Sequence, residues 1–200
     1  WFEQAAHNGN RIAQENIGGM YWHGGTVQKN ILTAIGWFQK AAAQRSVTAL
    51  SWLAYSYTRG SDIPRDEIKS TEYYKQAAEC GHTGAQYNYA MRLRQGTGIA
   101  KNLEQAAIWF ERAAQSGRAS AQCELGKMHL KGQGVPTDTA KAATLFAQAS
   151  QQGDTEAHYQ LALLLAEGNG ITQDKSHALT LCSQAAEGGH LEAQRALTEW

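Results

Sequence analysis

The feature of this chain that most restricts its fold is a six-residue pattern that returns every 36 residues without an insertion or a deletion. Its copies start at positions 1, 37, 73, 109, 145 and 181, and two of the fullest are Trp37-Phe38-Gln39-Lys40-Ala41-Ala42 and Trp109-Phe110-Glu111-Arg112-Ala113-Ala114. A fixed period of this length is typical of repeat architectures, in which each unit buries its apolar face against its neighbours. The pattern therefore predicts a stack of similar units.

The other half of each unit carries a second pattern with the spacing of a helix. Each copy starts with an alanine, and apolar or small residues follow it at offsets of 4, 5 and 8, which place these side chains on one helical face. A glycine closes every copy, where a left-handed residue would end the helix. These glycines are Gly24, Gly60, Gly96, Gly132 and Gly168.

A short loop and a second helix complete the unit. An apolar residue recurs in the loop as a predicted plug under the turn, at Val27, Ile63, Ile99, Val135 and Ile171. Asn or Asp, which are strong N-cap residues, precede the second helix at Asn30, Asp66, Asn102, Asp138 and Asp174. We expect the second helices to end at Gly81, Gly117, Gly153 and Gly189. Each unit is thus helix, loop, helix and turn.

Charge and hydropathy exclude two classes of partner. Lys and Arg together number 18, as do Asp and Glu, so the chain lacks the basic excess that phosphate backbones or anionic lipids attract. No apolar run approaches the roughly 20 residues that span a bilayer. We therefore expect no nucleic-acid binding and no membrane insertion.

The residues that could carry chemistry form no recognisable site. The three cysteines, Cys80, Cys123 and Cys182, show neither disulfide nor zinc spacing, and none of the seven histidines forms a close pair at metal spacing. No Gly-Lys-Ser or Gly-Lys-Thr follows His23-Gly24-Gly25, and Ser176-His177 lacks a nucleophile elbow. The aromatic residues at Trp37, Phe38, Tyr73, Tyr74, Trp109, Phe110 and Phe146 are predicted to be core. The sequence predicts a protein that is not an enzyme and that has no catalytic, metal or cofactor site.

The combined pattern resembles a known family. A-x-x-x-L-G-x-x-Y-x-x-G-x-G-V-x-x-D followed by A-x-x-W-F-x-x-A-A-x-x-G is similar to the Sel-1-like repeat (SLR), a relative of the tetratricopeptide repeat that is abundant in bacteria, and residues 85–117 and 121–153 match it best. The resemblance implies an all-α, right-handed superhelical solenoid whose first helices line the concave side. It also implies scaffold or adaptor roles and favours a periplasmic or secreted bacterial protein, with a cytoplasmic location as the alternative.

The resemblance covers the whole chain as one solenoid. We expect full repeats at 10–45, 46–81, 82–117, 118–153 and 154–189, with partial repeats at 1–9 and 190–200. Because both end units are incomplete, we expect further repeats, caps or a leader beyond them. Departures from the family pattern are Arg45 for a turn glycine, Ser61-Asp62 for the second loop glycine region, Gly36 inside a helix, and His129 and Cys182 for aromatic residues.

The candidate binding surface is the predicted concave stripe of the first helices. If the helix pairs stack as in tetratricopeptide repeats, the positions two, six and nine or ten residues after the leading alanine face the groove. The partner-binding candidates there are Trp22, Tyr55, Arg59, Tyr87, Met91, Arg94, Lys127, Lys131, Tyr159 and Leu163. Tyr, Trp, Arg and Met are enriched at interface cores, although some of these tyrosines could instead cover the seam between helices.

Three functions of different classes are compatible with this pattern. The first is a monomeric or weakly self-associating scaffold that binds a protein or peptide in the concave groove. The second is an inhibitor or immunity-type protein that clamps a toxin or a cell-wall enzyme. The third, an enzyme or a carbohydrate-binding module, would need a metal, cofactor or ligand pocket.

Overall fold

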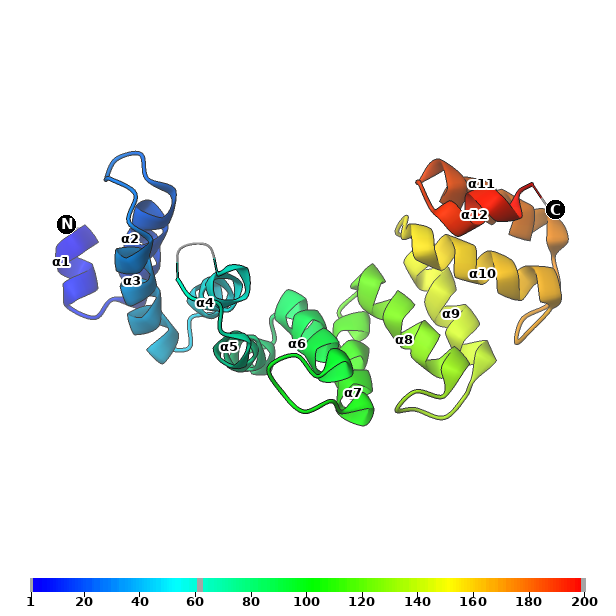
Figure 1. Cartoon of the computed structure of the whole chain (residues 1–200), viewed down its shortest axis with the longest axis horizontal. Coiled ribbons are helices and arrows are strands. Elements are labelled where there is room, and N and C mark those ends of the chain that lie inside the picture. The colour runs from blue at the N-terminus through cyan, green and yellow to red at the C-terminus, as the bar shows by residue number, and fades with distance from the viewer. Residues whose placement is uncertain (1, 61–62, 199–200) are drawn as a thin grey trace. The chain divides into compact units, whose positions relative to one another are not determined.

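The computed structural model describes residues 2–60 and 63–198, and every regular element in these residues is an α-helix (Figure 1). The helices are α1 (Phe2–His7), α2 (Arg11–His23), α3 (Ile31–Ala43), α4 (Val47–Arg59), α5 (Glu67–Glu79), α6 (Thr83–Gln95), α7 (Leu103–Gln115), α8 (Ala119–Lys131), α9 (Thr139–Ser150), α10 (Thr155–Glu167), α11 (Lys175–Glu187) and α12 (Leu191–Ala196). They form two compact units, residues 1–101 and 102–200, which we describe separately as unit 1 and unit 2. Within each unit every helix packs against the next one along the chain, so the prediction of an all-helical solenoid of helix pairs is confirmed.

The second helix of each pair begins where the sequence predicts. All five Asn and Asp residues are N-caps in extended conformation, and the side chain of each accepts a hydrogen bond from the backbone N–H three residues later. Asp138, for example, accepts from the N–H of Lys141 at 2.9 Å, and its own N–H donates to the carbonyl of His129 in α8 at 3.0 Å. The second bond closes the loop between the two helices.

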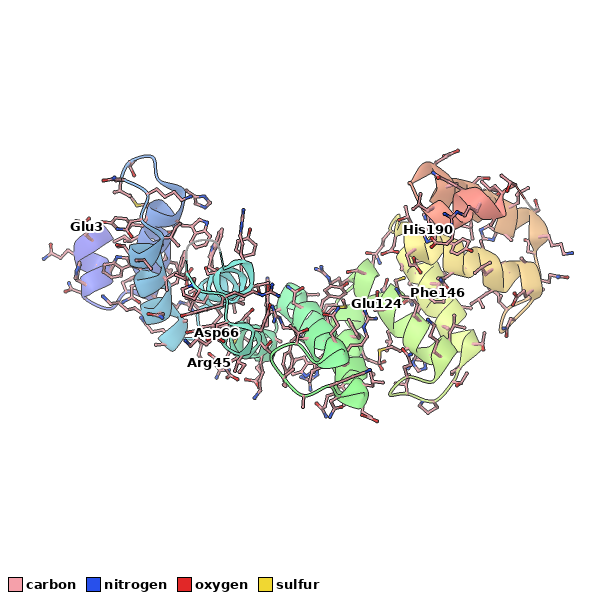
Figure 2. The ribbon with its side chains drawn as sticks, in the orientation of Figure 1. Glu3, Arg45, Asp66, Glu124, Phe146 and His190 are labelled. Atoms are coloured by element: carbon pink, nitrogen blue, oxygen red, sulfur yellow. The ribbon has the colours of Figure 1, made fainter. Side chains whose placement is uncertain are left out.

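The ends of the helices also follow the glycine pattern, with two exceptions. Gly60, Gly96, Gly132 and Gly168 adopt the left-handed conformation after the first helices, whereas Gly24 has φ 78° and ψ −162°. Gly81, Gly117, Gly153 and Gly189 form the turns after the second helices with φ between 83° and 89°. Arg45 occupies this place between α3 and α4 (Figure 2) and has φ 59°. It is the one residue other than glycine with positive φ in the part of the chain that the structure describes.

The core is built from close contacts between small residues and aromatic rings. Phe38 and Phe146 are fully buried, and a Cβ added at Gly18 or Gly126 would lie 2.6 or 2.7 Å from the ring of Phe38 or Phe146. The core prediction is wrong in part for Tyr73 and Tyr74, which are only half-buried. Their polar hydroxyls favour the edge of the core, where the Tyr73 ring stacks on Tyr57 and the Tyr74 ring lies beside Arg92.

The second glycine of the loop explains how one repeat contacts the one before it. A Cβ at Gly98 would clash with the backbone of Glu67, a Cβ at Gly134 with the backbone of Leu103, and a Cβ at Gly170 with the backbone of Thr139. Each of these three partners is the first residue of the preceding repeat's second helix. The equivalent predicted departure at Ser61-Asp62 lies outside the described residues.

The remaining departures from the family pattern are accommodated inside the helices. His129 is buried, and its Nδ1 lies 3.2 Å from the carbonyl oxygen of Pro136. Cys182 is fully buried, with its Sγ 3.6 Å from the carbonyl oxygen of Ala193. A Cβ added at Gly36 would meet no atom within 4 Å, so nothing in the packing of α3 requires a glycine there.

Candidate partner-binding site

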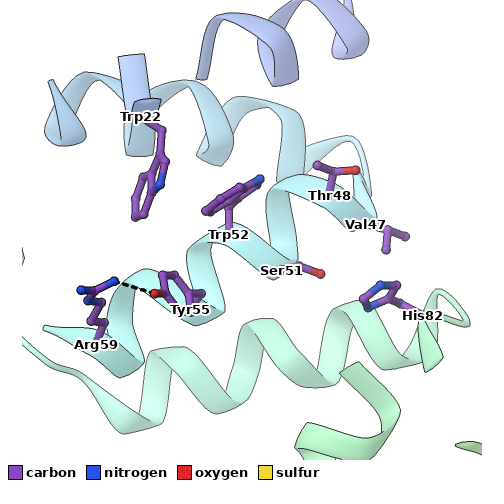
Figure 3. Close-up of a pocket in the computed structure, with 8 residues that line it drawn as sticks. All are labelled: Trp22, Val47, Thr48, Ser51, Trp52, Tyr55, Arg59 and His82. Atoms are coloured by element: carbon purple, nitrogen blue, oxygen red, sulfur yellow. Dashed lines mark hydrogen bonds between the residues drawn. The ribbon is translucent and has the colours of Figure 1, made fainter. Parts of the chain in front are cut away.

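The first helices α2, α4 and α6 of unit 1 form a surface that we call the first-helix face. A pocket on this face is lined by residues of α2, of α4 and by the N-cap of α6. Eight residues line this aromatic pocket (Figure 3): Trp22, Val47, Thr48, Ser51, Trp52, Tyr55, Arg59 and His82. Its volume is about 610 Å³. Ligand sites commonly measure roughly 300–1,000 Å³, so the pocket is large enough to hold side chains of a guest.

Three aromatic rings form the wall of the aromatic pocket. The centroid of Trp52 lies 4.9 Å from that of Trp22 and 6.2 Å from that of Tyr55. Behind them the fully buried ring of Phe38 stacks on Trp52, with an interplanar angle of 3° and a centroid distance of 5.9 Å. Contacts of this kind contribute about 0.5–1.5 kcal/mol per pair beyond area burial, so the rings are held in place before any guest arrives.

The two basic side chains of the aromatic pocket lie at its two ends (Figure 3). At one end, Nη1 of Arg59 donates to the hydroxyl of Tyr55 at 2.7 Å, and the guanidinium carbon lies 5.9 Å from the Tyr55 ring centroid. At the other end, His82 is the N-cap of α6, and its Nδ1 accepts from the N–H of Ala85 at 3.2 Å. No Asp or Glu belongs to the described lining of the aromatic pocket.

A second, smaller pocket of unit 1 is polar. It measures about 380 Å³, and its lining includes Tyr87, Met91 and the buried Arg92. Arg92 donates to Glu67 at 2.5 Å, to Thr71 at 3.1 Å and to Thr58 at 2.6 Å. The positive charge of Arg92 in this polar pocket is therefore already neutralised by Glu67.

The structure distributes the ten predicted binding residues over several places. Trp22, Tyr55 and Arg59 come together in the aromatic pocket, while Tyr87 and Met91 line the polar pocket, with Nη2 of Arg94 3.3 Å from Sδ of Met91. The other four residues lie in unit 2 and do not come together. Lys127 pairs with Glu124 at 2.7 Å, and Tyr159 packs on His190. Leu163 lines a separate pocket, and Lys131 is exposed.

Sequence reasoning missed Trp52, the central ring of the aromatic pocket, and His82 at its end. Trp52 lies three residues after the leading alanine, outside the predicted stripe. The signal was present, because the equivalent positions of the other repeats hold the polar residues Asn16, Asn88, Glu124 and Gln160. A tryptophan that replaces polar residues at one position of a repeat marks a local specialisation.

The first helices of unit 2 present ionic groups in the equivalent positions. Burial alone would lower the pKa of Lys127, but the hydrogen bond to Glu124 and the attraction of the acidic groups nearby together outweigh burial and raise that pKa. Glu156 lies 3.0 Å from Nε2 of His190 and accepts from Gln160 at 2.9 Å. These charges are satisfied internally, whereas the aromatic pocket of unit 1 presents apolar rings.

The described residues give no sign of other chemistry. No group of three or more His, Cys, Asp or Glu residues in 2–60 and 63–198 is placed to hold a metal ion. No helix in those residues has the length and apolar character that crossing a membrane requires. The three cysteines are free thiols, and burial raises the pKa of Cys123 and of Cys182.

Solved structures similar to this chain share its fold along its length. A protective antigen of uropathogenic Escherichia coli with an SLR fold matches 100% of this chain at 29% identity and a TM-score of 0.93, but the match covers only 43% of that protein. This chain thus spans less than half the length of that relative. A Sel1 repeat protein from Oxalobacter formigenes matches 94% of this chain and 75% of its own length, at 32% identity and a TM-score of 0.83.

A third similarity concerns the fold alone. An immunity protein from Pseudomonas aeruginosa matches 93% of this chain and 70% of its own length, at 19% identity and a TM-score of 0.51. Comparison with curated proteins gave no match.

The family model for the Sel1 repeat matches residues 1–10, 11–46, 47–82, 83–117, 119–154 and 155–190. Sel1 repeat proteins generally mediate protein–protein interactions, and the family is one of non-catalytic repeat scaffolds. Since six repeat matches account for nearly the whole sequence, and since the helix pairs have the SLR fold, this protein belongs to the Sel1 repeat family.

Proposed function

We propose that this chain is a non-catalytic scaffold that binds a protein partner on the first-helix face of unit 1. The observation that carries the proposal is the aromatic pocket, where Trp22, Trp52 and the 41% exposed Tyr55 surround an open volume. Trp, Tyr and Arg are the residues most enriched at binding hot spots. Phe38 supports the rings from behind, so little conformational freedom would be lost on binding.

The proposal predicts which substitutions weaken binding. Truncation of a hot-spot residue costs at least about 2 kcal/mol, which is about 30-fold in Kd. We expect Tyr55→Ala to have this effect, because its ring lies in the wall of the pocket and is partly exposed in the free protein. Ile68→Ala is the matched control, since Ile68 is also an exposed apolar residue, 71% accessible, but lies on the second helix α5.

The experiment begins with affinity capture from the source organism, followed by expression of each retained protein and calorimetric titration of the pair. A direct partner should lose affinity with Tyr55→Ala and keep it with Ile68→Ala, while circular dichroism shows both variants folded. The double variant Tyr87→Ala/Arg94→Ala tests whether the contact extends to the next repeat. If neither Tyr55→Ala nor this double variant changes the Kd of a direct partner, the first-helix face is not the binding surface.

The alternative prediction is an inhibitor that clamps a toxin or a cell-wall enzyme. It would use the same surface, so binding data alone do not separate it from a scaffold. The turnover of a captured enzyme, measured with and without this protein, does: stoichiometric inhibition identifies an inhibitor, whereas unchanged turnover identifies a scaffold.

A further inference from the structure

We propose that the aromatic pocket binds a segment of the partner protein in which an aromatic or branched aliphatic side chain is followed two residues later by Asp or Glu. This inference rests on the proposed function and specifies its ligand. The apolar side chain would lie against Trp22, Trp52 and Tyr55, and the carboxylate would accept hydrogen bonds from Arg59.

The geometry of the rings indicates an enclosed side chain instead of a flat stacking platform. Trp52 is tilted by 48° to Trp22 and by 84° to Tyr55. Rings at such angles surround a guest group from several sides. A sugar stacks on a flat aromatic platform, whereas the rings of Trp22 and Tyr55 are inclined to that of Trp52, so the three rings do not form one plane.

The charge of the pocket indicates an acidic neighbour for that side chain. Arg59 bonds to the Tyr55 hydroxyl and, among the described residues, forms no ion pair with a carboxylate. The buried Arg92, in contrast, pairs with Glu67. A guanidinium fits a carboxylate through two parallel hydrogen bonds, and it leaves donors for a guest after its single bond to Tyr55.

The same guanidinium disfavours two other ligands. Aromatic cages attract quaternary ammonium groups, but Arg59 at the edge of the rings would repel a cation. A phosphate group carries about −1.5 to −2 charges and is commonly met by a cluster of basic groups, whereas His82 lies at the opposite end of the pocket from Arg59 (Figure 3).

The position of the carboxylate within the guest follows from distances in the pocket. The Arg59 guanidinium is held 2.7 Å from the Tyr55 hydroxyl, and the Tyr55 ring centroid is 6.2 Å from that of Trp52. An extended chain advances about 3.3–3.6 Å per residue. Side chains of an extended chain alternate between its two faces, so residues two apart, about 6.6–7.2 Å, point the same way. The acidic residue is therefore expected two residues after the apolar one.

The test uses synthetic peptides with blocked ends and a fluorescent label. The reference peptide is Gly-Ser-Gly-Phe-Ser-Asp-Gly-Ser, and its variants replace Asp by Asn or Phe by Ala. We expect wild-type protein to bind the Asp peptide at least fivefold more tightly than the Asn peptide, and the Ala variant to lose binding. Arg59→Gln should abolish the preference for Asp, so that the variant binds the Asp and Asn peptides with equal affinity.

Control variants separate the pocket from general electrostatics. Lys101→Gln also removes one positive charge from unit 1, at an exposed position outside the pocket, and should keep the Asp preference. Trp52→Ala should weaken both peptides equally. A peptide that ends in Phe with a free carboxylate, and a chitooligosaccharide, serve as competing probes.

Several results would overturn the inference. One is a Kd of the Asp peptide weaker than about 1 mM. The others are equal affinity for the Asp and Asn peptides, and tighter binding of either competing probe. If the captured partner still depends on Tyr55 while the peptides show no acidic preference, the specified ligand is wrong and the proposed function stands. If the partner is insensitive both to Tyr55→Ala and to Tyr87→Ala/Arg94→Ala, the specified ligand and the proposed function are both wrong.

Discussion

Nη1 of Arg92 lies 2.5 Å from Oε2 of Glu67 in unit 1, at the positions where unit 2 has Leu103 and Met128. The Arg92 side chain is 9% exposed and Met128 is fully buried, so a buried ion pair in unit 1 occupies positions that hold two apolar residues in unit 2. Desolvation cancels much of the attraction between buried charges. The ion pair should therefore contribute specificity more than it contributes stability.

Replacing one partner or both distinguishes these contributions. Glu67→Leu leaves the Arg92 charge buried, so we expect a loss of about 2–3 kcal/mol in unfolding free energy. The double variant Glu67→Leu/Arg92→Met copies the pair found in unit 2 and should unfold within about 1 kcal/mol of the wild type. Urea unfolding followed by circular dichroism measures both values. A double variant as unstable as the single one would contradict this account.

The same pair predicts a dependence on pH. Burial alone would raise the pKa of Glu67, but hydrogen bonds from Arg92 and Arg65 outweigh it and hold the pKa below its ordinary value of 4.5. A carboxyl whose pKa is lowered on folding stabilises the protein above its unfolded pKa, and this stabilisation is lost as the pH falls through the folded pKa. The Glu67→Leu/Arg92→Met variant should consequently lose less stability than the wild type between about pH 5 and pH 3, as measured by thermal unfolding.

The loop glycine of unit 2 should be intolerant of substitution. Gly134 has φ 72°, and a Cβ there would overlap the backbone of Leu103. We expect Gly134→Ala to destabilise unit 2 by about 2 kcal/mol or more, because positive φ and a backbone clash act together. Gly36→Ala is the matched control in a helix, where free space should make the change stabilising by about 0.5–1 kcal/mol. Equal melting temperatures for the two variants would contradict the prediction.

Replacing Arg45 by glycine should increase stability, in contrast to the replacement of Gly134. It holds φ 59° at a turn where other repeats have glycine. The left-handed backbone conformation costs about 1–2 kcal/mol in a residue with a Cβ. Glycine removes this cost but loses more backbone entropy on folding, which offsets part of the gain. Arg45→Gly should therefore stabilise unit 1 by about 0.5 kcal/mol. Urea unfolding with Arg45→Ala as control tests it, since alanine removes the charge and keeps the strain. If Arg45→Ala gives the same gain, the charge and not the backbone is responsible.

The cysteines should differ in reactivity. Burial raises the pKa of the Cys123 and Cys182 thiols, and both side chains are inaccessible, whereas Cys80 is half-buried. Because the thiolate is the nucleophile, iodoacetamide at neutral pH should modify Cys80 first in the folded protein. Mass spectrometry of timed digests gives the order, and a urea-unfolded sample should show all three modified at similar rates. Early modification of Cys123 would indicate local opening of unit 2.

The sequence allowed the helices and their ends to be predicted because those depend on local chemistry. Asp138 caps α9 through a bond to Lys141, three residues away, and Gly132 ends α8 through its own backbone conformation. The N-caps of the first helices were not predicted, because the residue at this position varies among the repeats. Asn10, Ser46 and Asp154 cap with side-chain oxygens, His82 caps with a ring nitrogen, and Arg118 makes no side-chain cap hydrogen bond.

The candidate site could be predicted only in part because it depends on residues far apart in the sequence. The repeat pattern identified Trp22, Tyr55 and Arg59, but the orientation of Trp52 depends on Phe38, which belongs to a different helix. Arg92 likewise finds partners 25 and 34 residues away, at Glu67 and Thr58. The 36-residue period predicts only the features that all repeats share, whereas these contacts occur where one repeat differs from the others.

The glycines at 98, 134 and 170 meet main-chain atoms of Glu67, Leu103 and Thr139, three residues with unrelated side chains. These three repeats therefore contact the repeats before them through main-chain atoms, which every sequence possesses. A whole 36-residue module carrying this glycine could be copied or transplanted next to a different neighbour without redesigning that contact. Arrays of this kind can lengthen by duplication while the side chains on their first helices diverge.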